Sequence, residues 1–174
     1  MLVADYILSR LADEGIDTAF MVYGGAMSEL ADAFTRQTRI KYIVPMHEQA
    51  AGFMAEGYAK AKGVPGLAIA TSGPGGGNLV TAIQNCYYDS TPCIFITGQV
   101  QTKFMRPNTE LRQLGFQETP IVDIVKPITK FAVTPQSPKF ALWCLDAAVW
   151  AMKDGRPGPV LLDLPVDIQR AECS

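Results

Sequence analysis

The scarcest chemically useful residue in this chain is histidine, which occurs once, as His47. His47-Glu48 begins like the zinc-binding pattern HExxH, but Ala51 stands where the second histidine belongs. A two-histidine zinc site therefore cannot form. A Ser-His-Asp triad would have to use His47, and no serine lies in a nucleophile-elbow pattern. The sequence argues against zinc and serine hydrolase chemistry, and we predict no metal ligands.

Clusters of basic residues are also missing, and the net charge is -2. We therefore expect no nucleic-acid partner and no acidic membrane surface. No apolar run approaches membrane-spanning length, and the start of the chain does not resemble a signal peptide. The four cysteines have no CxxC spacing and lie in or beside apolar segments, as buried free thiols in a reducing compartment do. We expect a cytoplasmic protein with free Cys86, Cys93, Cys144 and Cys173.

Neither standard glycine-rich phosphate-binding pattern is present. The turn from Gly73 to Asn78 lacks the lysine of GxxxxGK[ST], and Asn78 replaces the last glycine of GxGxxG. Backbone amides at the start of a helix attract anions. Glycine-rich turns between a strand and a helix also serve close packing alone. These residues leave both interpretations open.

What the chain has is an alternation of helical and strand-like segments, and most strands are continuous apolar runs. Such runs predict a parallel sheet that is covered on both faces. We predict an α/β fold, a three-layer, doubly wound, mostly parallel sheet of about six strands with helices on both faces, in one domain over residues 1–174. The predicted strands cover residues 18–23, 40–45, 66–71, 92–97, 128–133 and 159–164, and the helices 3–14, 28–36, 48–62, 78–88, 121–125 and 138–152. Ser28 is the predicted N-cap of its helix.

Glu48 is the residue that most clearly suggests chemistry. It follows the predicted buried strand 40–45, at the end where open α/β sheets bind ligands. Its neighbours include Met46 and Phe53, and apolar surroundings favour the neutral form of a carboxyl group. A structural explanation competes, because an acid in the first helical turn interacts favourably with the helix dipole.

Two further strand ends favour the chemical interpretation of Glu48. Gly24-Gly25 follows the first predicted strand, and Gly73-Pro74-Gly75 follows the third. The carboxyl ends of parallel strands meet at one edge of a sheet, so we expect these segments to lie together. A long irregular stretch, Gly98 to Thr119, follows the fourth strand, and loops of this length in compact domains are usually functional or disordered.

Several ordered motifs resemble one known family over nearly the whole chain. The sequence is similar to the N-terminal pyrimidine-binding domain of thiamine diphosphate enzymes, with the acetolactate synthase branch as the best match. The motifs are Gly24-Gly25-Ala26, His47 to Ala59, Thr71 to Asn78, Thr97 to Val100, Phe116-Gln117-Glu118, Thr129-Lys130 and Gly155 to Val160.

The resemblance implies a role for each matched position. Glu48 would be the glutamate that hydrogen-bonds N1′ of the cofactor's aminopyrimidine and so helps the cofactor lose its C2 proton. His47 would be a structural neighbour rather than an acid–base group. The positions that match the cofactor pocket are Gly24, Gly25, Thr71, Pro74, Gly75 and Asn78.

Three more positions, Phe116, Gln117 and Lys130, match residues that face substrate or cofactor in acetolactate synthase-like enzymes. A simpler interpretation exists for two of them, with Phe116 as a loop anchor and Lys130 as a solvated strand end. The first loop departs from the family pattern, because Met21 and Tyr23 replace a glycine and a proline. This change at the rim of the pocket leaves the substrate undetermined.

The family binds the cofactor's diphosphate and Mg²⁺ through another domain, marked by Gly-Asp-Gly and Asn-Asn motifs that this sequence lacks. We therefore expect Mg²⁺ only through a partner domain or subunit. FAD is unexpected, since nothing here resembles the flavin-binding middle domain. The resemblance implies a homodimer or an α2β2 assembly.

The hypothesis from sequence is the pyrimidine-binding half of an acetolactate synthase-like carboligase or 2-oxo acid decarboxylase that needs a diphosphate-binding partner. One alternative is a non-catalytic assembly domain that keeps the fold, although such a protein would not need Glu48. Another is a dinucleotide-binding domain that uses the Gly73 turn. The absence of the GxGxxG fingerprint disfavours it.

Overall fold

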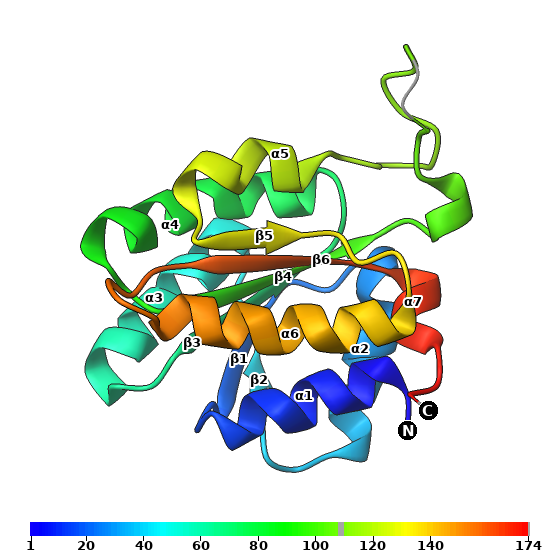
Figure 1. Ribbon diagram of the computed structural model, residues 1–174. Coiled ribbons are helices and arrows are strands. Elements are labelled where there is room, and N and C mark those ends of the chain that lie inside the picture. The colour runs from blue at the N-terminus through cyan, green and yellow to red at the C-terminus, as the bar shows by residue number, and fades with distance from the viewer. Residues whose placement is uncertain (108–109, 174) are drawn as a thin grey trace.

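All six strands run in the same direction and form one sheet in the order β2-β1-β3-β4-β6-β5 (Figure 1). The computed structural model describes residues 1–107 and 110–173. The predicted fold class is confirmed, and the pairing is parallel throughout. The strands are β1 (Thr18–Met21), β2 (Lys41–Ile43), β3 (Gly66–Ala70), β4 (Cys93–Gln99), β5 (Phe131–Val133) and β6 (Val160–Pro165).

Helices cover both faces of the sheet (Figure 1). One face packs against α1 (Val3–Asp13), α2 (Ser28–Ala33), α6 (Pro138–Lys153) and α7 (Val166–Arg170). The other packs against α3 (Glu48–Lys62), α4 (Pro74–Asp89) and α5 (Ile121–Val125). None of the helices in the described residues is long and apolar enough to cross a membrane.

Most positions of the central strands are apolar because both of their faces are buried. Ile69 and Ile96 point to the α1 and α6 side, whereas Ala68 and Phe95 point to the α3 and α4 side. All four side chains are fully buried. The sequence therefore shows continuous apolar runs rather than alternation.

Local sequence signals set the two ends of α3 and the start of α6. His47 Nδ1 accepts a hydrogen bond from the Gln49 backbone N–H at 3.1 Å and so caps the start of α3. Gly63, with φ of 74°, ends the helix. At the start of α6, the Ser137 hydroxyl accepts from the Phe140 N–H at 3.3 Å.

The prediction of a buried strand over residues 40–45 is wrong. Only Lys41–Ile43 pair, as the edge strand β2, and all three residues are exposed. Ile40 alone is buried. An edge strand has a neighbour on one side only, and within the described residues no strand pairs with the outer side of β2. The apolar residues that suggested burial, such as Val44, remain on the surface.

Two other elements differ from their predicted extents. The helix expected at 28–36 is divided into α2 and η2 (Phe34–Arg36), and η1 (Gly25–Met27) precedes it directly. Because the helical turn already begins at Gly25, Ser28 is not an N-cap. The strand expected at 128–133 shortens to β5, since η4 (Lys126–Ile128) holds its first residue.

The cysteine prediction is confirmed. Cys86, Cys93 and Cys144 are buried, Cys173 is partly buried, and all four are free thiols.

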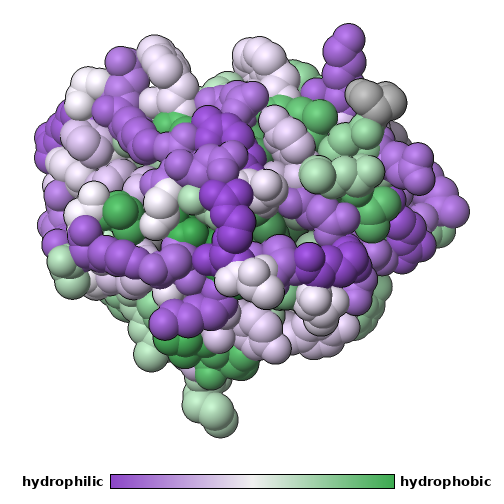
Figure 2. All heavy atoms as spheres, turned by 90° about the horizontal axis from the view of Figure 1, so that it is seen from below, coloured by the Kyte–Doolittle hydropathy of each residue, from purple (hydrophilic) through white to green (hydrophobic). Residues whose placement is uncertain are grey.

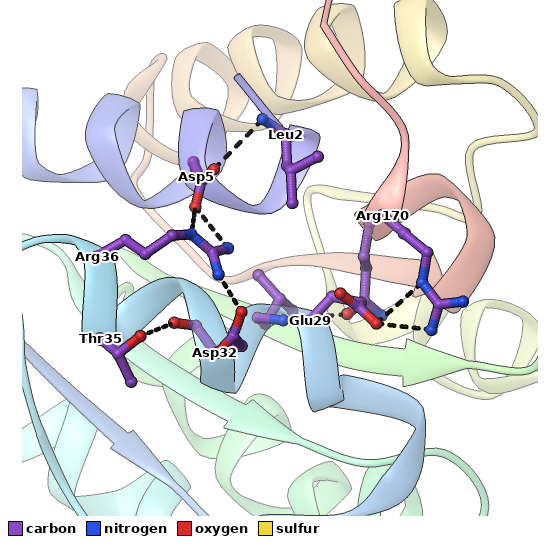
Figure 3. A network of polar contacts seen from close by, with 9 residues as sticks. Leu2, Asp5, Glu29, Asp32, Thr35, Arg36 and Arg170 are labelled. Carbon is purple, nitrogen blue, oxygen red and sulfur yellow. Dashed lines mark hydrogen bonds and ion pairs between the residues drawn. The ribbon is translucent and has the colours of Figure 1, made fainter.

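A surface network of ion pairs joins α2 to its neighbours (Figure 3). Arg36 pairs with Asp5 of α1 at 2.7 Å and with Asp32. Arg170 of α7 pairs with Glu29 of α2 at 2.7 Å. Figure 2 views the molecule from below. On the face seen there, hydrophilic side chains cover the centre and hydrophobic ones lie near the lower margin. Exposed ion pairs of this kind contribute little to stability.

One carboxyl group is buried within the sheet. Asp163 of β6 is 1% exposed. Its Oδ1 accepts from the Thr97 hydroxyl at 2.8 Å, and its Oδ2 accepts from the Gln99 amide at 2.9 Å and the Thr134 hydroxyl at 3.0 Å. Burial outweighs these uncharged donors and raises the pKa of Asp163 to about 6.

Through Asp163, we expect the free energy of unfolding to fall as pH rises from about 4 to about 6. The folded protein keeps this proton up to about pH 6, whereas the carboxyl of the unfolded chain loses it near pH 3.8. Rising pH therefore favours the unfolded chain. Asp163→Asn lacks this titrating carboxyl group. The free energy of unfolding of the variant minus that of wild type should therefore increase by about 3 kcal/mol as the pH rises through this range.

Urea unfolding of both proteins at about pH 4 and about pH 7 measures this difference. Asp123→Asn, which changes an exposed acid of α5, is the control and should leave the wild-type profile unchanged. A stability difference between Asp163→Asn and wild type that is equal at both pH values would contradict the prediction.

Candidate functional site

The parallel sheet brings distant parts of the chain to its carboxyl edge. Gly24 and Gly25 follow β1, Thr71 follows β3, and Gly73 leads from there into α4. Glu48 is the first residue of α3, after β2. The edge predicted from the sequence therefore exists, and these segments contact one another there.

Glu48 is fixed by a neighbour on the next helix. Asn78 of α4 donates a hydrogen bond from Nδ2 to Glu48 Oε2 at 2.9 Å. Within the described residues, Oε1 of Glu48 accepts no hydrogen bond, and the side chain is partly exposed. One oxygen thus holds the carboxyl group in place, and the other can bind an N–H group of a ligand.

Thr71 is packed between two glycines. A Cβ added to Gly24 would lie 2.4 Å from Thr71 Cβ, and one added to Gly75 would lie 2.8 Å from Thr71 Cγ2 and 3.5 Å from Glu48 Oε1. The Thr71 hydroxyl also accepts from the Ala26 N–H at 3.3 Å. The first loop, Thr71 and the start of α4 therefore form one continuous wall that leads to Glu48.

The Gly73 turn receives the long loop that follows β4. Gly73 has φ of 63° and ψ of -126°, a conformation open essentially to glycine alone. A Cβ there would also lie 2.8 Å from Cβ and from the carbonyl oxygen of Gln117. Gln117 itself has φ of 59°. Glycine is thus required both by the backbone turn and by the approach of Gln117.

A cavity of about 550 Å³ lies beside this wall. The loop forms much of its outer side, and the Phe116 side chain is 82% exposed there. Glu48, Pro74 and Asn78 do not line the cavity, but Thr71 joins them to it. The lining residues are Gly25, Ala26, Thr71, Ser72, Val100, Gln101, Phe104, Leu114, Gly115, Phe116, Gln117 and Val166.

Lys130 is the one predicted site residue that the fold does not bring to this edge. Its N–H bonds the carbonyl of Pro159, just before β6 begins, and its Nζ bonds the Asp154 carbonyl. It therefore lies at the amino ends of β5 and β6, across the sheet from Glu48. Among the described residues, Lys130 lines a different pocket from the cavity that Phe116 and Gln117 line.

Sequence reasoning missed part of the cavity. Val166 follows Pro165 at the carboxyl end of β6, so the strand-end argument that selected Glu48 would also have selected it. Val100 and Phe104 lie in the long loop, whose length signalled function without showing which side chains turn inward.

The apolar enclosure expected around Glu48 is incomplete in this chain. Met46 is fully exposed, and Phe53 is 39% exposed. In the described residues, no group of three or more His, Cys, Asp or Glu side chains is placed to hold a metal ion. Glu48 is the acid beside the glycine and Thr71 wall, and Asn78, its partner, is neutral.

One protein-family model matches the chain, over residues 1–125: the N-terminal TPP binding domain of thiamine pyrophosphate enzymes. Acetolactate synthase of Arabidopsis thaliana, a chloroplastic protein, is 41% identical over 167 residues, which is 96% of this chain and 24% of the relative.

The mitochondrial acetolactate synthase catalytic subunit of Saccharomyces cerevisiae is 38% identical over 92% of this chain and 23% of the relative. Glyoxylate carboligase of Escherichia coli O157:H7 is 39% identical over 99% of this chain and 28% of the relative. The chain thus spans about a quarter of the length of these relatives.

The glycine wall yields a stability prediction with an internal control. Gly24→Ala places a methyl group against Thr71, so we expect it to lower the free energy of unfolding by ~1–3 kcal/mol. Gly25→Ala adds the same group where nothing lies within 4 Å, so we expect a change below ~0.5 kcal/mol. Denaturant unfolding of the two variants compares them, and equal effects would show that the Thr71 contact does not restrict residue 24.

Proposed function

Because this chain belongs to the thiamine pyrophosphate enzymes, matching their N-terminal TPP binding domain, we propose that it is the pyrimidine-binding part of an acetolactate synthase-like carboligase or 2-oxo acid decarboxylase. In this proposal it forms one domain, residues 1–174, and a diphosphate-binding domain or subunit completes the active site. The cofactor is thiamine diphosphate, bound here at its aminopyrimidine end.

The observation that carries the proposal is the Glu48 carboxyl group beside a wall of close-packed backbone. Asn78 holds Oε2, and Oε1 remains open to a ligand. Gly24 and Gly75 let two backbone turns pack directly against Thr71, and the close-packed wall that results suits a flat heteroaromatic ring. These features fit an aminopyrimidine, which offers a ring nitrogen to a carboxyl group.

Each residue has a defined part in this binding. Glu48 holds a proton at N1′ of the ring, which an amide could not exchange. Asn78 orients Glu48, and Gly24, Gly25, Thr71, Pro74 and Gly75 shape the pocket. When bound, the cofactor supplies the carbanion chemistry of the reaction.

We propose that Phe116 and Gln117 border the substrate, because both line the cavity next to Thr71. Lys130 lies at the amino ends of β5 and β6, so within this chain it is on the opposite side of the sheet from Phe116 and Gln117. A role for Lys130 at a substrate would therefore use a surface separate from this cavity. The 2-oxo acid and its acceptor depend on this cavity together with the partner's contribution.

Exposed apolar side chains around Glu48 support the need for a partner. They come from β2, the segment after it and α3, and a monomer gains nothing from exposing them. We propose that the diphosphate-binding partner covers this surface, binds Mg²⁺ and completes a homodimer or α2β2 assembly. The residues are Tyr42, Ile43, Val44, Met46, Phe53 and Met54.

No flavin site is proposed for this chain, because the matched motifs all belong to the pyrimidine-binding part. We also propose a cytoplasmic location. The three buried free thiols fit a reducing compartment and support it.

The central test replaces Glu48 in a complex reconstituted with a diphosphate-binding partner that carries the Gly-Asp-Gly and Asn-Asn motifs. Glu48→Gln keeps the shape but cannot exchange a proton, so turnover of pyruvate should fall by at least ~100-fold while assembly is retained. Glu172→Gln, at an exposed acid near the end of the chain, should retain activity. Full activity of Glu48→Gln would favour a non-catalytic assembly domain.

A second test uses the chain alone. The 174-residue protein should not turn over pyruvate, and calorimetry should detect at most weak binding of thiamine diphosphate, because the diphosphate has no binding groups here. NAD should not bind. Robust pyruvate decarboxylation by the chain alone would contradict the need for a partner, and tight NAD binding would favour a dinucleotide-binding domain.

A further inference from the structure

The long loop that carries Phe116 and Gln117 is held at both ends by one side chain. Gln99, the last residue of β4, is 2% exposed. Its Nε2 donates to the Thr119 carbonyl at 3.0 Å, near the end of the loop. Its Oε1 accepts from the Val100 N–H at 2.9 Å, at the start of the loop. The amide of Gln99 therefore joins the two ends of the loop.

Asp163 determines the orientation of that amide. The second N–H of Gln99 donates to Asp163 Oδ2 at 2.9 Å. Thr97 and Thr134 hold the carboxyl group from either side, at 2.8 Å and 3.0 Å. A carboxylate accepts but does not donate, so the amide nitrogen must face it and the amide oxygen must face Val100.

Asp163 is buried, and none of the described residues bonds a cationic group to it. Its three partners are uncharged groups of β4 and of the residue after β5. A second, separate cavity lies beside Asp163 and Gln99. The other charged groups that line it are Arg106 and Glu118 of the loop and Asp123 of α5. A leucine would fill such a position in a sheet core at a lower desolvation cost. The carboxyl group is therefore explained by what it orients rather than by its own burial.

We propose that Asp163 and Gln99 are positioning residues that set the place of the described parts of the loop, 100–107 and 110–119, over the cavity at the carboxyl ends of the strands. Neither side chain lines that cavity. They act through the ends of the loop, whereas Phe116, Gln117 and Val100 are the lining side chains that move with it. The loop makes two further anchoring contacts, between Thr102 and Asp167 at 3.0 and 2.5 Å.

The test measures amide hydrogen exchange in the 174-residue chain. Asp163→Ala removes the acceptor, and we expect the protection factors of the Val100 and Thr102 amides to fall about tenfold relative to those of Leu67 and Ile69 in β3. The comparison with β3 separates local loosening of the loop from a general loss of stability. Asp123 lines the same second cavity as Asp163, so Asp123→Asn is the control and should change neither the loop amides nor the β3 amides.

The conservative variant should restore the loop. In Asp163→Asn, the carbonyl can accept from Gln99 and Thr134 while the new amide donates to the Thr97 hydroxyl, so loop protection should remain within about twofold of wild type. If Asp163→Ala does not fold, Gln99→Met removes the amide at similar volume and should loosen the loop equally. Loop amides that lose no more protection than β3 amides in Asp163→Ala or Gln99→Met would overturn the proposal.

A kinetic consequence rests on the proposed function. In the reconstituted complex, Gln99→Met should raise KM for the 2-oxo acid more than it lowers kcat, because the loop borders the substrate and Glu48 is untouched. A loosened loop with unchanged KM would leave the positioning role intact and count against Phe116 and Gln117 as substrate neighbours.

Discussion

The common direction of the six strands is the constraint on which the site depends. Each parallel strand must be followed by a crossover before the next can pair, so every carboxyl end lies at the same edge and every helix lies on a face. Glu48, Thr71 and Gln99 are far apart along the chain, yet each stands at or just after one of these ends. Chemistry at this edge therefore needs no specially shaped domain, only suitable residues where strands stop.

The pocket wall uses closeness of backbone rather than charge. Gly24 and Gly75 bring two turns within contact of the Thr71 side chain, and Glu48 is held by the neutral amide of Asn78. An arrangement with one acid and no neighbouring base can hold a proton on a ligand, but it cannot neutralise a diphosphate. The proposed division of work between this chain and a diphosphate-binding partner agrees with that composition.

The fold and the place of Glu48 could be predicted from the sequence, whereas contacts through the long loop could not. Continuous apolar runs indicate buried strands, and Gly24 and Gly73 follow two of them, whereas Glu48 follows the exposed edge strand β2. Edge strands break this rule, because β2 is apolar and exposed, and residues 40–45 were misjudged for that reason. Lys130 is selected by its motif alone, and the direction of β5 places it at the amino ends of the strands, away from Phe116. The Asp163 and Gln99 contact joins residues 64 positions apart and leaves no local pattern.

The two outermost strands of the sheet, β2 and β5, are short and have similar flanking residues. β2 and β5 each pair over only three residues. Lys41 is the first residue of β2, and Lys130 directly precedes β5. A proline follows two residues after the end of each strand, Pro45 and Pro135. Short edges bordered by lysine and proline resist the addition of a further strand from another molecule. The sheet is thereby protected against growth into aggregates by strand addition, so a partner would contact side chains of this protein rather than extend its sheet.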